Sequence, residues 1–111
     1  MADNTLEITC QQVAKMRTDG EPFVLLDCRE QDEYDLVAIE GSELLPMSQI
    51  AERKSDLVGK ENEQLVVYCH HGMRSLQTVN WLRQQGFSNA VSMAGGIDAW
   101  AVEINPSMTR Y

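Results

Sequence analysis

The chain has 111 residues, 43% of them hydrophobic, which is enough for one small globular domain spanning residues 1–111. Seventeen acidic residues against nine Lys and Arg residues give a net charge of -8, which opposes binding to nucleic acid or to anionic membranes. No apolar run approaches the ~20 residues of a membrane span, and residues 1–7 lack the features of a secretory signal. We therefore expect a cytoplasmic protein with no nucleic-acid or membrane partner, acting as a monomer.

The cysteines are Cys10, Cys28 and Cys69, an odd number without C-x-x-C spacing. This pattern fits neither a disulfide framework nor a zinc site. We expect free thiols in a reducing compartment, with no metal and no cofactor.

Elements in the first half alternate between helix and strand. Thr9 and Gln12 form a capping-box pattern that predicts a helix, which ends at residues 20–22. The apolar run from Phe23 to Leu26 predicts a strand buried on both faces, and a helix is expected from Glu30 to Leu36.

A short strand is expected at Glu43 to Leu45, near the middle of the chain. Ser48 is then expected to cap a helix that carries Ile50 and Leu57 on a charged background. Residues 59–63 are strongly polar and predict a solvated connection.

The second half continues the alternation. A buried strand is expected from Leu65 to Tyr68, and a helix from about Met73 to Gln85 with Leu76, Val79 and Leu82 facing inward. A strand at residues 90–93 and a last helical turn containing Ile97, Ala99 and Trp100 follow. Apolar strands that alternate with helices predict an α/β fold, a parallel sheet covered by helices on both faces.

Cys69 lies where a buried strand ends and a helix begins, an edge of a parallel sheet at which ligands collect. Free N–H groups at the start of the helix, the helix dipole and Arg74 all favour the thiolate, which is the nucleophilic form of cysteine. We predict that Cys69 is a nucleophile; packing as a small buried apolar residue is the alternative.

Three segments of the chain resemble the rhodanese-type sulfurtransferases in their single-domain form. Asp27 to Tyr34 resembles the family's Asp-x-Arg-x-x-x-Glu-Tyr segment, Cys69 to Ser75 its active-site loop, and Gly95 to Trp100 its C-terminal signature. The resemblance implies a rhodanese-like fold with a central parallel sheet of about five strands. One segment departs, because Val37 to Ser42 replaces the usual Gly-His-Ile-Pro-Gly-Ala, which leaves open whether the pocket there is open or closed.

The resemblance implies a two-step transfer of sulfane sulfur. Cys69 would attack the outer sulfur of a small anionic donor such as thiosulfate, release sulfite and hold the sulfur as a persulfide, which a thiophilic acceptor then removes. Backbone amides of the loop would stabilise the anionic sulfur. The predicted persulfide and substrate-binding loop comprises His70, His71, Gly72, Met73, Arg74 and Ser75.

Neighbouring residues are given supporting roles. Arg74 is expected to anchor an anionic donor, or else to pair with Asp27 or another strand-end carboxylate. Asp27 is expected to accept hydrogen bonds from the loop, with Arg29 paired to Glu33. For Cys28, packing at the strand end and a role as resolving thiol both stay open.

Two other functions are considered. The chain could be a persulfide relay or a binding module serving a protein such as a sulfur-carrier activating enzyme, a sulfur carrier or a cysteine desulfurase; residues 104–111 resemble the tail of rhodanese modules fused to adenylating enzymes. A rhodanese-fold phosphatase or arsenate reductase needs an arginine six positions after the cysteine. Arg74 stands five after Cys69, which favours a cradle for a single sulfur atom.

Overall fold

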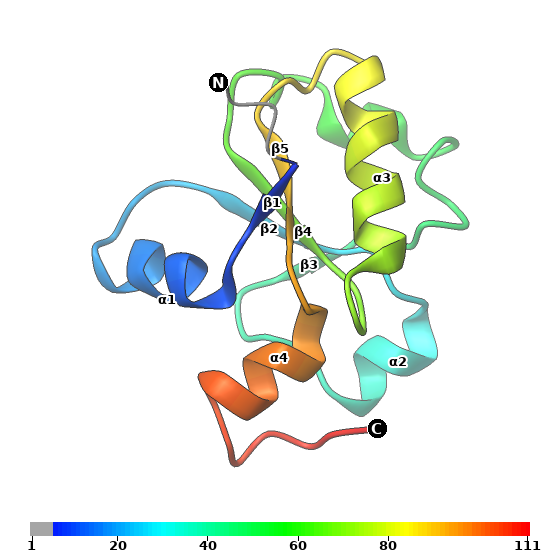
Figure 1. The fold of residues 1–111 in the computed structure, drawn as a ribbon. Coiled ribbons are helices and arrows are strands. Elements are labelled where there is room, and N and C mark those ends of the chain that lie inside the picture. Colours follow the sequence, from blue (N-terminus) through cyan, green and yellow to red (C-terminus); the bar gives the residue numbers. More distant parts are fainter. Residues whose placement is uncertain (1–5) are drawn as a thin grey trace.

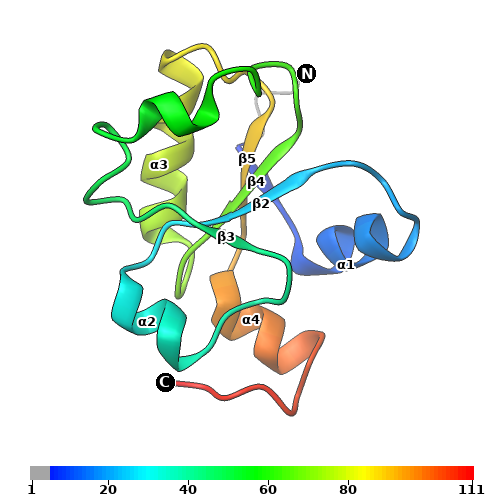
Figure 2. The same ribbon diagram turned by 180° about the vertical axis from the view of Figure 1, so that it is seen from behind.

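The computed structural model describes residues 6–111, and over these residues five parallel strands form one sheet in the order β1-β5-β4-β2-β3 (Figures 1 and 2). This arrangement confirms the predicted α/β fold with a central parallel sheet of about five strands. The strands are β1 (Glu7–Ile8), β2 (Val24–Asp27), β3 (Glu43–Leu44), β4 (Leu65–Tyr68) and β5 (Ala90–Met93). The helices are α1 (Cys10–Thr18), α2 (Gln31–Leu36), α3 (Met73–Gln84), α4 (Gly96–Glu103) and the 3-10 turn η1 (Lys54–Leu57).

Helices cover both faces of the sheet, as Figures 1 and 2 show: α3 lies on one face, and α1 and α4 lie together on the other. Each face has its own apolar core, because successive residues of a strand point to opposite sides. Val67 and Val79 belong to the core under α3, whereas Val66 and Val13 belong to the core under α1 and α4. No helix within residues 6–111 is long and apolar enough to cross a membrane.

Local sequence signals explain the boundaries of several elements. The Thr9 hydroxyl accepts a hydrogen bond from the Gln12 N–H, and the Gln12 side chain accepts one from the Thr9 N–H, so the predicted capping box is confirmed. All four residues of β4 are fully buried, as expected of a central parallel strand.

Two details differ from the predictions. Strand β1, which pairs with β5 at the edge of the sheet, was not predicted, because two residues are too few to show a periodic pattern. The helix expected after Ser48 is wrong: the chain forms turns and then η1, and the Ser48 hydroxyl donates to Glu30 Oε1 (2.8 Å). Residues Ile50 and Leu57 still reach the core under α3 from these turns, so the segment is held by its apolar anchors and not by a regular helix.

Candidate active site

Cys69 lies at the bottom of a tight loop between β4 and α3, with a relative exposure of only 1%. Its Sγ accepts hydrogen bonds from the backbone N–H groups of Gly72 (3.1 Å) and Ser75 (3.3 Å), and Ser75 Oγ lies 3.5 Å away. Gly72 has a φ of 105°, a left-handed conformation that turns its N–H toward the sulfur and that glycine adopts without strain. The structure therefore brings two predicted loop residues, Gly72 and Ser75, around Cys69 in one sulfur-binding cradle.

The cradle favours a thiolate at Cys69. The pKa of Cys69 is lowered to about 4, chiefly because the thiol of Cys28, at the end of the neighbouring strand, donates a hydrogen bond to it, against the opposing effect of burial. The Ser75 hydroxyl and the amides of Ser75 and Gly72 contribute to the same lowering. The pKa of Cys28 is raised by donating that hydrogen bond, by burial and by the negative charge of Cys69, so Cys28 keeps its proton.

The start of α4 braces the loop from behind. Ile97 N–H donates to the Cys69 carbonyl (2.8 Å), and Asp98 N–H donates to the His70 carbonyl (3.1 Å). A Cβ on Gly96 would lie 2.4 Å from the Cys69 oxygen and 2.5 Å from the His70 oxygen. Only glycine lets the helix start approach this closely, so the loop carbonyls are satisfied by α4.

A pair of buried serines closes the cradle toward β5. Ser75 Oγ lies 2.7 Å from Ser92 Oγ and 3.2 Å from the Gly72 carbonyl oxygen. Ser92 was missed in the sequence, although it is a polar residue within a short buried strand.

On α3, Ser75 and Thr78 are buried while Leu76 is only half-buried, so the predicted inward stripe is partly wrong.

Arg74 does not extend freely toward a substrate. Its Nη1 and Nη2 donate to Glu33 Oε1 (2.7 Å) and Oε2 (2.9 Å) in a two-pronged ion pair between α3 and α2. This pair lowers the pKa of Glu33 to about 2. The structure thus shows the ion-pair alternative, but with a carboxylate of α2 in place of Asp27.

Asp27 and Arg29 form a buried ion pair at the end of β2. Arg29 Nη2 lies 2.6 Å from Asp27 Oδ2, Arg29 Nε and N–H also donate to the carboxylate, and both side chains have no exposed surface. The predictions that Asp27 accepts hydrogen bonds from the cysteine loop and that Arg29 pairs with Glu33 are therefore wrong. The sequence shows these charges but not which carboxylate each arginine reaches.

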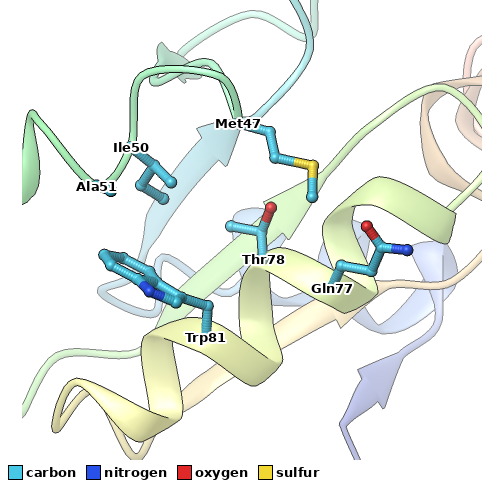
Figure 3. Close-up of a pocket in the computed structure, with 6 residues that line it drawn as sticks. All are labelled: Met47, Ile50, Ala51, Gln77, Thr78 and Trp81. Carbon is cyan, nitrogen blue, oxygen red and sulfur yellow. The ribbon is translucent and has the colours of Figure 1, made fainter.

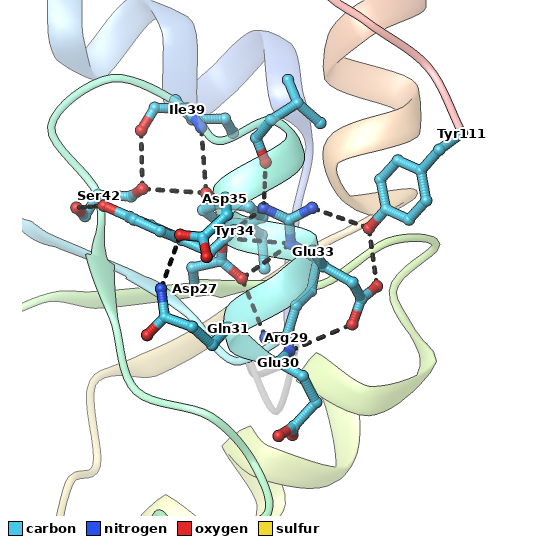
Figure 4. A network of polar contacts seen from close by, with 12 residues as sticks. Asp27, Arg29, Glu30, Gln31, Glu33, Tyr34, Asp35, Ile39, Ser42 and Tyr111 are labelled. Carbon is cyan, nitrogen blue, oxygen red and sulfur yellow. Dashed lines mark hydrogen bonds and ion pairs between the residues drawn. The ribbon is translucent and has the colours of Figure 1, made fainter.

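Tyr111 links Arg29 and Glu33, the members of two different ion pairs, as Figure 4 shows for its hydroxyl. Its hydroxyl accepts from Arg29 Nη1 (2.8 Å) and donates to Glu33 Oε2 (2.8 Å). Its ring stacks on His70 with a centroid distance of 3.8 Å, and His70 stacks on His71 at 3.9 Å. Support for the loop therefore comes from the far end of the chain, through an aromatic contact that the sequence analysis did not assign.

The two histidines and Met73 lie at the rim. Burial lowers the pKa of His70, so its ring favours the neutral form. His71 and Met73 are exposed, and neither appears among the donors to Cys69. Among the described residues, no group of three or more His, Cys, Asp or Glu side chains gathers to hold a metal ion.

The segment that replaces the expected Gly-His-Ile-Pro-Gly-Ala is held by a small polar network, visible in Figure 4. Ile39 N–H donates to the Tyr68 hydroxyl (3.1 Å), which lies 3.0 Å from Ser42 Oγ. Ser42 Oγ in turn donates to the Ile39 carbonyl (2.7 Å), and Ile39 is buried. These contacts pack residues 37–42 against β4, and the carbonyl of Val37 accepts from Arg29 Nη2 (2.6 Å).

A hollow of about 230 Å³ lies between α3 and the segment after β3 (Figure 3). Its lining is mostly apolar. One of the lining residues, Thr78 of α3, adjoins the thiol of Cys28. Met47 donates its N–H to the Cys28 carbonyl (2.9 Å), so the hollow lies beside Cys28 and not over Cys69. The hollow is lined by Met47, Ile50, Ala51, Gln77, Thr78 and Trp81.

Comparisons with known proteins agree with this geometry. The Rhodanese-like domain family matches residues 9–103. Adenylyltransferase and sulfurtransferase MOCS3-2 of Zea mays is 35% identical over 109 residues, which cover 94% of this chain and 23% of that protein. Thiosulfate sulfurtransferase GlpE of Pseudoalteromonas translucida is 34% identical over 93 residues, covering 83% of this chain and 86% of GlpE.

Solved structures show the same fold. A rhodanese-like domain protein from Staphylococcus aureus superimposes with a TM-score of 0.80 at 26% identity, covering 95% of this chain and 97% of that one. The chain spans about a quarter of the length of MOCS3-2 and of the probable adenylyltransferase/sulfurtransferase MoeZ of Mycobacterium tuberculosis. With a family match over most of its length and relatives named as sulfurtransferases, the chain belongs to the rhodanese-like domain family.

Proposed function

We propose that the chain is a sulfurtransferase that carries sulfane sulfur as a persulfide on Cys69. The observation that carries this proposal is the cradle around Sγ, in which two backbone N–H groups point at one sulfur atom and the Ser75 hydroxyl oxygen lies 3.5 Å from it. Such donors stabilise a localised negative charge without supplying a proton to the reaction. A persulfide has this need, because its terminal sulfur is anionic.

The first step would join the Cys69 thiolate to the outer sulfur of a donor. With thiosulfate, the electron pair of the thiolate forms the new S–S bond, and the old S–S bond leaves with its electrons as sulfite. A thiolate is required for this attack, and the pKa of about 4 at Cys69 keeps it charged at neutral pH. In the second step, a thiophilic acceptor takes the terminal sulfur and regenerates the thiolate.

Arg74 and Glu33 would control how an anionic donor approaches. Because Glu33 already occupies both prongs of Arg74, the donor must either share the guanidinium or displace the carboxylate. The Arg74 side chain is 36% exposed, so it is partly accessible to solvent. This arrangement supplies a positive charge at the rim of the site in a chain with a net charge of -8.

Loop length argues against the phosphatase or arsenate reductase alternative. A tetrahedral oxyanion needs donors spread around a wide loop and an arginine that faces its oxygens. Here the Gly72 and Ser75 amides converge on Sγ itself, and Arg74 is turned to Glu33.

Persulfide formation is tested by incubating the chain with thiosulfate and measuring its intact mass. We expect a gain of one sulfur atom on Cys69, which cyanide removes as thiocyanate, and no gain in Cys69→Ala. Cys10→Ala is the matched control, because it removes a buried thiol away from the cradle. A cyanide-labile sulfur that persists in Cys69→Ala would contradict the proposal.

A protein acceptor is the second candidate, favoured by the relatives in which this domain accompanies an adenylyltransferase. The match to MOCS3-2 covers 94% of this chain, and the last residue of the tail, Tyr111, contacts His70 of the loop. In this version, sulfur would pass from Cys69 to a sulfur-carrier protein, and a cysteine desulfurase could replace thiosulfate as donor. Transfer of labelled sulfur from the loaded chain to a sulfur-carrier protein whose carboxyl terminus has been adenylated, with an external thiol present to cleave the acyl disulfide and release the thiocarboxylate, is the expected result, and it should be absent with Cys69→Ala.

A further inference from the structure

Cys28 and Cys69 lie side by side at the carboxyl edge of the sheet. They directly follow Asp27 and Tyr68, which are paired in the register of β2 and β4, and Cys28 N–H continues the ladder to the Tyr68 carbonyl (3.0 Å). Neighbouring strands are about 4.8 Å apart, which falls within the Cα separation that a disulfide spans. Both side chains face α3 and belong to the same core.

The two thiols share one buried core and differ in protonation. Cys28 is 1% exposed, retains its proton and donates it in a hydrogen bond to the Cys69 thiolate. Both are free thiols in this structure. Packing alone would not require a thiol at position 28, because an apolar side chain would fill the same space without placing an ionisable group in the core.

We propose that Cys28 is a resolving thiol, which attacks Cys69 Sγ in the persulfide form and expels the terminal sulfur as hydrosulfide. The inference rests on the proposed persulfide. The Cys28 sulfur forms a disulfide with Cys69 Sγ, the persulfide S–S bond breaks, and its electron pair leaves with the terminal sulfur. That sulfur takes the Cys28 proton, so Cys69–S–S⁻ and Cys28–SH become the Cys28–Cys69 disulfide and HS⁻.

The negative charge moves away from Cys28 when the persulfide forms. It then lies on the terminal sulfur and no longer on Sγ, so one cause that holds the Cys28 proton is weakened. Attack by Cys28 therefore follows formation of the persulfide, and the acceptor must take the terminal sulfur before Cys28 expels it. An external thiol is the class of reductant that reopens the disulfide.

The test compares the wild-type chain with Cys28→Ser, each treated with thiosulfate in the absence of any other thiol. We expect the wild type to release up to one sulfide per chain, to become two hydrogens lighter and to yield a linked Cys28–Cys69 peptide. Cys28→Ser keeps the added sulfur and releases sulfide only when an external thiol is supplied. Cys28→Ala provides a second variant, and the linked peptide is measured on the wild type itself.

The two proposals fail differently. A wild-type chain that holds its added sulfur as long as Cys28→Ser does, without a linked peptide, overturns the role of Cys28 and leaves the persulfide intact. If neither chain gains sulfur, releases sulfide or forms the linked peptide, the proposed persulfide is overturned and the role of Cys28 with it.

Discussion

The two faces of the sheet handle charge differently at its carboxyl edge. On the face under α3, Cys69 is surrounded by neutral donors, namely backbone N–H groups, the Ser75 hydroxyl and the Cys28 thiol. On the other face lies Asp27, the residue before Cys28, whose carboxylate carries a full negative charge. Arg29 neutralises this charge in an ion pair of 2.6 Å, and neither side chain has any exposed surface. The same two strands build both, because alternate side chains point to opposite faces.

The difference shows how a small domain keeps a reactive anion distinct from structural charge. Both arginines near the site are already paired, Arg29 with Asp27 and Arg74 with Glu33. The anion at Cys69 is therefore stabilised by dipoles that are fixed by the fold. The ion pairs belong to the framework, whereas the cradle is the site of the proposed sulfur chemistry.

The largest effect is expected from removing the buried ion pair between Asp27 and Arg29. Arg29→Ala leaves the Asp27 carboxylate buried and unpaired and should lower the free energy of unfolding by about 3 to 5 kcal/mol. Arg53→Ala, which removes an exposed ion pair with Asp56, should cost less than about 1 kcal/mol. Urea unfolding curves measure both, and similar losses in the two variants would show that burial of the Asp27 pair is unimportant.

The next prediction concerns the contact between α4 and the cysteine loop. Gly96→Ala puts a methyl group against two loop carbonyls at 2.4 and 2.5 Å, and overpacking with a positive φ should cost about 3 kcal/mol. Gly86→Ala is the matched control, since its φ is also positive but a Cβ there meets nothing within 4 Å, and we expect a loss of about 1 kcal/mol. Equal urea midpoints for the two variants would contradict the close contact.

A smaller change sharpens the sulfur-binding face. Ser75→Ala removes one donor to Cys69, so the pKa of this thiol should rise from about 4 by about one to two units. In the wild type, the rate of alkylation by iodoacetamide should be level above pH 6 and fall as the pH approaches 4; in the variant, the fall should begin at higher pH. Ser107→Ala, on an exposed turn, should leave the profile unchanged, and an unmoved profile in Ser75→Ala would argue against the cradle.

The smallest effect is expected at the rim. Glu33→Gln should lower the free energy of unfolding by less than about 1 kcal/mol at neutral pH, because the pair with Arg74 is partly exposed. The pKa of Glu33 is lowered from 4.5 to about 2, so the wild-type advantage is complete above pH 4.5 and is lost as the pH falls through 2. Stability measured against pH for both chains checks this, and an advantage that grows in acid would refute it.

Local patterns predicted the framework well. The capping box at Thr9, the buried strand before Cys69 and the glycine pair before α4 all appear as expected. Each depends on a few neighbouring residues whose preferences are strong. Where the pattern was weak, as after Ser48 or at the two-residue strand β1, tertiary packing decided the conformation.

Partners could not be predicted in the same way. When several opposite charges are nearby, no local sequence signal shows which of them a charged side chain will pair with. The partners predicted for Arg29 and Arg74 therefore differ from those in the structure. Ser92 contacts Ser75 from 17 residues further along the chain. Tyr111 contacts Arg29 from 82 residues further along. Only folding brings such residues together.

The sequence by itself determined most of the alternation of strands and helices, the position of Cys69 at a strand end and the tight spacing of its loop. These follow from short-range rules of periodicity, capping and glycine conformation. The tertiary structure decided which donors surround the sulfur, which carboxylate holds each arginine, and that Cys28 stands next to Cys69. The reason is physical, because hydrogen bonds and ion pairs act over a few ångströms in space and are indifferent to separation along the chain.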